Sequence, residues 1–186
     1  QQRKEYSKQK KCSYKSVLMI ASYRKYKGIY EFAELARLIP DYTFNLVLST
    51  TKSDIIQFKK DIGNINNLNI FPLQTNLHPF YSEAKLLLQL SHPESWIETF
   101  GLTILEAMIY GIPAIVPFVG GPTELVENGK NGYLVNPHNL SEIKEKILYI
   151  MENSDVYNSF SICAFEKAKQ FNLVESLNNI ETYLFL

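Results

Sequence analysis

Short apolar runs alternate with segments of helical periodicity along most of this chain. We expect six strands, at Ser16–Ala21, Tyr42–Leu48, Leu68–Leu73, Leu86–Leu90, Ala114–Phe118 and Tyr133–Val135. A strand followed by a helix and then another strand favours right-handed crossovers, which place the strands parallel and cover both faces of the sheet. The alternation therefore predicts an α/β fold with a mainly parallel six-stranded sheet.

The segments between these runs have helical spacing. Apolar residues recur on one face of Gly28–Ile39, and Ser53 is expected to cap a helix that ends near Ile62. The remaining helices are expected at Pro79–Lys85, at Phe100–Tyr110, after caps at Ser141 and Ser154, and in a last segment with an apolar finish. The pattern predicts one Rossmann-like three-layer domain over residues 15–186, preceded by a linker remnant or disordered lead-in at 1–14.

Length and charge exclude several classes of protein. The 186 residues can bury one sizeable core, and 19 Lys and Arg balance 19 Asp and Glu. A neutral chain argues against nucleic acid as a partner. No apolar run approaches the ~20 residues that span a bilayer, and the polar start is unlike a signal peptide. We expect a cytoplasmic protein whose Cys12 and Cys163 are free thiols.

Three informative loops follow predicted strands. They are Ser22–Gly28, Ser91–Thr99 and Val119–Thr123. Carboxyl ends of parallel strands meet at one edge of the sheet, where α/β proteins bind their ligands. The sequence therefore predicts that these loops converge on one binding site.

Two glutamates flank a Phe100–Gly101 turn. Glu98 precedes the turn, whereas Glu106 lies inside the largely apolar segment Phe100–Ile109. A carboxylate in an apolar helix is costly unless it is paired, protonated or facing a ligand. Glu106 is therefore a candidate binding residue about two turns, or roughly 10 Å, inside the expected helix.

Structural roles remain open for each candidate. Glu106 could pair with a lysine or a helix cap at the edge of the core, and Glu98 could be a helix N-terminal acid. Lys27 and Arg24 could be solvated, and Gly101 could serve only the turn. The histidines, His78, His92 and His138, are expected in structural or loop roles. The sequence shows no Asp-x-Asp pair and no His/Cys cluster, so no metal site is expected.

A block at the centre of the chain resembles a known family. ETFGLTILEAM, a following Gly-x-Pro, GGPTELV and NGKNGYLV occur in register. They resemble the C-terminal, donor-binding half of retaining GT-B glycosyltransferases, the glycosyl transferases group 1 family. The resemblance covers roughly Val17–Phe171. This chain departs from it at Thr99, where the family usually has glycine, and at Ser22, which occupies the position of an arginine.

The resemblance implies a nucleotide-diphosphate sugar as ligand. Glu106 would hold the ribose hydroxyls, and Glu98 would be the catalytic-site residue that contacts hydroxyls of the transferred sugar. Lys27, with Arg24 in place of the missing arginine, would neutralise the diphosphate. Backbone N–H groups of Phe100, Gly101 and Leu102 at the helix start would bind the same group. Neither a metal nor another cofactor is expected.

The resemblance also implies a larger protein. A donor-binding domain needs a separate amino-terminal acceptor-binding domain, so this chain alone is expected to transfer nothing. The whole enzyme would move a sugar, with retention of configuration, to a glycan or lipid-linked acceptor in polysaccharide biosynthesis. It could associate peripherally with the inner face of the membrane. The alternatives are a non-catalytic nucleotide-binding or assembly module of the same fold and a sugar-nucleotide epimerase.

Overall fold

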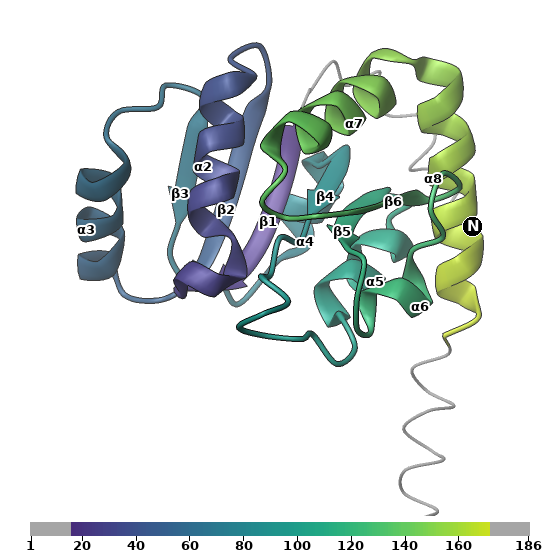
Figure 1. Cartoon of the computed structure of the whole chain (residues 1–186), viewed down its shortest axis with the longest axis horizontal. Helices are drawn as coiled ribbons and strands as arrows, with labels where there is room; N and C mark the ends of the chain where they lie inside the picture. The colour runs from purple at the N-terminus through teal and green to yellow at the C-terminus, as the bar shows by residue number, and fades with distance from the viewer. Residues whose placement is uncertain (1–15, 172–186) are drawn as a thin grey trace, which may run out of the picture.

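The computed structural model describes residues 16–171 as a sheet covered by helices on both faces (Figure 1). Every neighbouring pair of strands is parallel, in the order β3-β2-β1-β4-β5-β6. The strands are β1 Ser16–Ser22, β2 Thr43–Ser49, β3 Leu68–Phe71, β4 Leu86–Leu88, β5 Ala114–Pro117 and β6 Gly132–Val135. The predicted parallel six-stranded sheet is confirmed.

Helices cover the two faces of the sheet with separate apolar clusters. The helical elements are η1 Lys25–Lys27, α2 Ile29–Leu38, α3 Lys52–Ile62, α4 His78–Glu83, α5 Leu102–Ile109, α6 Pro122–Leu125, α7 Leu140–Glu152 and α8 Ser154–Lys169. Residues of α2 and α7 pack on one face, and those of α4, α5 and α8 pack on the other. This arrangement confirms the three-layer prediction.

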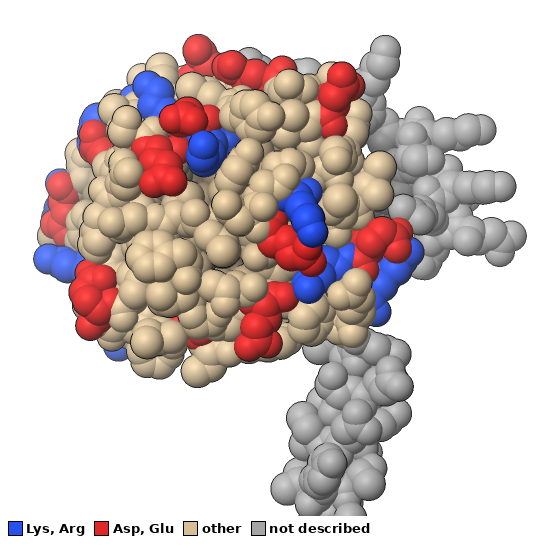
Figure 2. Space-filling view, turned by 45° about the vertical axis from the view of Figure 1, so that its right-hand side comes forward, with Lys and Arg blue, Asp and Glu red and all other residues tan. Residues whose placement is uncertain are grey.

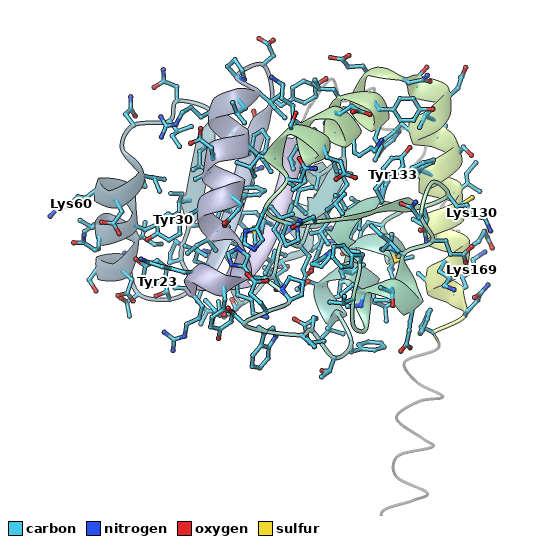
Figure 3. The ribbon with its side chains drawn as sticks, in the orientation of Figure 1. Tyr23, Tyr30, Lys60, Lys130, Tyr133 and Lys169 are labelled. Atoms are coloured by element: carbon cyan, nitrogen blue, oxygen red, sulfur yellow. The ribbon has the colours of Figure 1, made fainter. Side chains whose placement is uncertain are left out.

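The central strands are apolar because both of their faces are buried. Leu86, Leu87 and Leu88 of β4 are each at most 1% exposed, and adjacent residues belong to opposite clusters. Near the left edge in Figure 3, Tyr23 and Tyr30 lie between the start of α2 and α3. Both rings contact Phe58 of α3 edge-on, which fixes that helix against the sheet.

Three helix caps lie one or two residues before the predicted positions. Thr51, rather than Ser53, caps α3 in a capping box with Asp54. Asn139 replaces Ser141 as the cap of α7, and Asn153 replaces Ser154 as the cap of α8. The sequence offers several capping residues in each stretch, and the one whose side chain reaches the free N–H groups becomes the cap.

Helix α5 begins at Leu102, so the prediction of Phe100 as its first residue is wrong. Gly101 has a φ of +91°, which breaks the helical path, and its carbonyl accepts the first hydrogen bonds of the helix, from Ile104 and Leu105. Glu106 is therefore four residues from the start, about 6 Å along the axis rather than 10 Å. The helix is also less buried than expected, because Leu102 and Ile109 are exposed.

Some predictions fall outside the described residues. These are the lead-in at 1–14, Cys12 and the segment after Phe171. Cys163 is a free thiol, as predicted. Among residues 16–171, no helix is both long and apolar enough to cross a bilayer. On the face shown in Figure 2, acidic and basic side chains are intermixed rather than gathered by sign.

Candidate functional site

The order of the strands creates a crevice between β1 and β4. From β1 the chain continues to β2 on one side, whereas β4 is followed by β5 on the other. At this switch point a cavity of about 300 Å³ opens beyond the carboxyl ends of the strands. It is lined by Met19, Ile20, Ala21, Ser22, Lys27, Ser49, Gln89, Ser91, Glu98, Gly101, Leu102 and Thr103. Two of the three predicted ligand-edge loops contribute side chains to it.

A glycine holds the loop after β1 against the end of β4. Gly28 has a φ of +76°, and a Cβ atom at this position would lie 2.2 Å from the Leu90 carbonyl oxygen. Only a residue without a side chain permits this approach. The contact brings the preceding residue, Lys27, to the cavity.

Lys27 and Glu98 meet at the cavity wall. Lys27 Nζ donates a hydrogen bond to Glu98 Oε2 at 3.1 Å, and their side chains are 15% and 27% exposed. The ammonium also lies 4.9 Å from the centre of the Trp96 ring, which stacks on Tyr26. The predicted cation and the predicted acid therefore share one place, although 71 residues separate them.

The two glycines after β5 support the loop that carries Glu98. The Gly121 N–H donates to the Glu98 carbonyl at 2.8 Å. A Cβ at Gly120 would lie 2.4 Å from that carbonyl oxygen, and one at Gly121 would lie 2.4 Å from the Thr99 oxygen. The third predicted loop therefore supports the site indirectly, because it fixes the backbone of Glu98.

The start of α5 forms another part of the wall. Gly101, Leu102 and Thr103 line the cavity. The first N–H groups of a helix lack partners within it and carry the positive end of its dipole. This wall is therefore suited to an anion.

Glu106 is held by a tyrosine rather than by a cation. Its Oε2 accepts a hydrogen bond of 2.6 Å from the Tyr81 hydroxyl. Burial first, and then the neighbouring Glu106, raises the pKa of Tyr81, so the phenol remains a proton donor. Glu106 is half-buried and is not among the residues that line the cavity.

Arg24 and Phe100 also lie outside the cavity lining. Arg24 is exposed at the residue before η1. Phe100 is 39% exposed and contacts the Phe171 ring edge-on. The structure therefore brings together Lys27, Glu98, Gly101 and Leu102, but not the other three predicted donor-binding residues.

Several polar residues of the site were missed from the sequence. Ser22, Ser49, Gln89 and Ser91 line the cavity at the ends of three strands. Gln89 donates to the Ser91 hydroxyl at 2.9 Å, and its buried Oε1 has no hydrogen-bond partner among the described residues. Their positions directly after apolar runs were the available signal. The cluster of Glu31, His92 and His138 was also missed.

Comparison with known proteins identifies the family. Residues 1–167 match the family described as "Glycosyl transferases group 1". The chain belongs to this family. It is 25% identical to N-acetyl-alpha-D-glucosaminyl L-malate synthase of Bacillus anthracis over 178 residues, which cover 93% of the chain and 46% of the relative. The chain thus spans less than half the length of that relative.

Solved structures agree on the fold. HepE of Anabaena, in complex with UDP and glucose, superposes with a TM-score of 0.80 at 23% identity over 98% of this chain and 50% of its own. The C-terminal domain of LpcC, a glycosyl transferase group 1 family protein of Francisella tularensis, superposes with a TM-score of 0.70 at 24% identity. That match covers 91% of this chain and 92% of the LpcC domain. The domain is one half of a GT-B fold, as predicted.

Proposed function

We propose that this chain is the donor-binding domain of a retaining glycosyltransferase. The observation that carries the proposal is the convergence of Lys27, Glu98 and the start of α5 on one cavity at the switch point of the sheet. A nucleotide-diphosphate sugar offers two charged phosphates and many hydroxyls. The cavity offers a cation and helix N–H groups for the former and a carboxylate for the latter.

The diphosphate would bind between Lys27 and α5. The ammonium supplies a positive charge, and the N–H groups of Gly101, Leu102 and Thr103 supply hydrogen bonds without a charge of their own. These groups would stabilise the nucleotide diphosphate as it leaves. We propose that no metal is needed for this step. Arg24, exposed in the loop that follows β1, would reach the phosphates only after its side chain turns inward.

The two glutamates would accept hydrogen bonds from hydroxyls on either side of the diphosphate. Glu98 lines the cavity and would contact the transferred sugar. Glu106, one helical turn beyond the start of α5, would accept from the ribose hydroxyls with the oxygen that Tyr81 leaves available. In this proposal Glu98 contacts the reacting sugar and Glu106 positions the nucleotide.

The acceptor would bind a second domain. The chain spans half of HepE and nearly all of the LpcC domain, which is a C-terminal one. We propose that a glycan or lipid-linked acceptor binds an amino-terminal partner domain and that the chain alone is inactive. The stereochemistry is testable by fusing such a domain to this chain and determining the anomeric configuration of the product by NMR. An inverted product would refute the retaining assignment.

Calorimetric titration of the purified chain with uridine, guanosine and adenosine diphosphates tests donor binding. HepE binds UDP in its solved structure, so UDP is the first ligand to use. Lys27→Ala should weaken binding at least tenfold, because a buried phosphate loses its counter-ion. Glu106→Gln should weaken it less, and Glu98→Gln should affect the nucleotide sugar more than the free diphosphate.

Lys60→Ala is the matched control for the loss of a lysine. Lys60 lies on α3 and points away from the domain (Figure 3), so its removal should leave the affinity unchanged. Equal effects of Lys27→Ala and Lys60→Ala would refute the proposed phosphate site. An absence of binding by all three diphosphates at millimolar concentration would overturn the proposed function in favour of a non-catalytic module.

A further inference from the structure

Two histidines and a glutamate from distant parts of the chain meet beside the loop that follows β4. Glu31 lies on α2, His92 follows β4, and His138 lies between β6 and α7. Each offers one nitrogen or carboxylate oxygen, and these three atoms all lie within 4.8 Å of one another. The two imidazole rings have centroids 4.3 Å apart. Three separate segments of the chain therefore bring atoms that could ligate a metal close together.

Hydrogen bonds within the protein do not satisfy every polar atom of this cluster. His92 Nε2 lies 3.0 Å from Glu31 Oε1, yet their relative orientation does not form a hydrogen bond. Among the described residues, three buried side-chain polar atoms lack a hydrogen-bond partner, and two of them are His92 Nε2 and Glu31 Oε2. Buried polar atoms without partners are rare in native proteins and require an explanation. A ligand bound by both groups would provide one.

A fourth residue lies beside both histidines, in the position that a supporting group of a metal site would occupy. Glu94 Oε1 lies 2.8 Å from His138 Nε2 and 3.9 Å from His92 Nδ1. Carboxylates commonly orient metal-binding histidines through the second ring nitrogen. Glu94 can orient His138 in this way or complete the coordination.

We propose that Glu31, His92 and His138 bind one Zn²⁺ ion, with Glu94 as orienting group or fourth ligand. Two imidazoles and a carboxylate suit Zn²⁺, whereas Ca²⁺ and Mg²⁺ prefer oxygen ligands alone. Ligands of a tetrahedral Zn²⁺ ion lie roughly 3.3 Å apart, given Zn–N and Zn–O bonds of about 2.0–2.1 Å. The three ligand atoms lie within 4.8 Å of one another, so the side chains would turn inward to reach that spacing when the ion binds.

This site would be structural rather than catalytic. None of its four residues lines the cavity between β1 and β4. The ion would instead tie α2 and the segment before α7 to the loop after β4. The His92 N–H of that loop already donates to the Tyr26 carbonyl at 2.8 Å, next to Lys27. Bound Zn²⁺ would therefore restrain the support of the donor-site loop without contacting the donor.

The test is titration of the chelator-treated chain with Zn²⁺ by calorimetry, with Tm as a second readout and Co²⁺ absorption as a third. We expect one ion per chain, a rise in Tm with Zn²⁺, visible bands typical of tetrahedral Co²⁺, and no effect of Mg²⁺. Glu31→Gln and His138→Gln should each weaken Zn²⁺ at least tenfold, since even residues that only orient ligands change affinity by about 10- to 100-fold.

His78→Gln is the matched control. His78 is exposed at the start of α4, outside the cluster, and its replacement should leave Zn²⁺ affinity unchanged. Far-UV circular dichroism verifies that each variant folds. If His138→Gln does not fold, the affinity of Glu31→Gln for Zn²⁺ provides the test. Absence of Zn²⁺ binding by the unaltered chain would overturn the proposal. Equal affinity in the unaltered chain and the folded variants would also overturn it, whatever the outcome of the nucleotide titrations.

Discussion

Replacing Gly28 with alanine should disrupt the contact that places Lys27 at the cavity. Two costs add at this position. The φ of +76° is strained for any residue with a Cβ, at roughly 1–2 kcal/mol. The new Cβ would also meet the Leu90 carbonyl oxygen at 2.2 Å and the Leu90 Cβ at 2.5 Å. Leu90 is fully buried and cannot yield, so overpacking should cost a further ~1–3 kcal/mol.

Gly129→Ala isolates the steric part of this cost. Gly129 has the same φ of +76°, but a Cβ there would meet nothing within 4 Å. Its replacement should therefore cost only the conformational ~1–2 kcal/mol. The difference between the two variants should be about 1–3 kcal/mol. In a domain of this size that difference lowers Tm by about 2–4 °C for each kcal/mol.

Urea unfolding followed by far-UV circular dichroism measures both variants, provided that the m-value is unchanged. Gly28→Ala should also weaken binding of a nucleotide diphosphate, because Lys27 is the adjacent residue, whereas Gly129→Ala should not. Equal free energies of unfolding for the two variants would show that the close approach to Leu90 carries no cost. The reasoning from that distance would then be wrong.

Two further substitutions test local interactions. Tyr81→Phe removes the hydroxyl that donates to Glu106 and should reduce the free energy of unfolding by about 1–2 kcal/mol, measured in urea. Thr51→Ala removes the cap of α3 and should cost about 1 kcal/mol. It should also raise the pKa of Asp54, measured by NMR titration, because hydrogen bonds from Thr50 and then Thr51 lower that pKa. A lowered pKa in the folded state stabilises the protein above the ordinary pKa of aspartate, and this contribution is lost as pH falls through the lower folded value.

Either expectation can fail clearly. An unchanged free energy of unfolding in Tyr81→Phe would mean that water replaces the phenol at Glu106. An Asp54 pKa that stays low in Thr51→Ala would assign the shift to the Thr50 hydroxyl and the Thr51 backbone N–H, which the substitution leaves in place. Ser53→Ala should cost less than Thr51→Ala, because Thr51 rather than Ser53 accepts the hydrogen bond from the Asp54 N–H, and Ser53 only shares a 2.7 Å hydrogen bond with the Thr51 hydroxyl.

The layers of the fold were predictable from the sequence because burial leaves a local signature. Leu86–Leu88 are apolar at consecutive positions since both faces of β4 are covered, and this pattern is visible in one dimension. The exact helix starts were less predictable. Near α7, both Asn139 and Ser141 are good caps, and only the path of the preceding chain selects Asn139.

The site was predictable where a motif constrains the backbone and less so where residues meet through the fold. The Phe100–Gly101 turn indicated that a helix starts nearby. The helix begins at Leu102, because Gly101 adopts a left-handed conformation. The resemblance placed Lys27 and Glu98 in one site, and their ion pair confirms the proximity. His92 and His138 are 46 positions apart, and no spacing rule links them; only the parallel order of the strands brings them together.

The ion pair between Lys27 and Glu98 has a consequence for how an anion enters the cavity. An incoming phosphate must compete with a carboxylate that already neutralises the lysine. If the phosphate wins, Glu98 loses its counter-ion at the same moment and is released to find hydroxyl donors. Binding of the charged part of a ligand to Lys27 would then free Glu98 for the uncharged part in the same step. A sugar without phosphate could not cause this change.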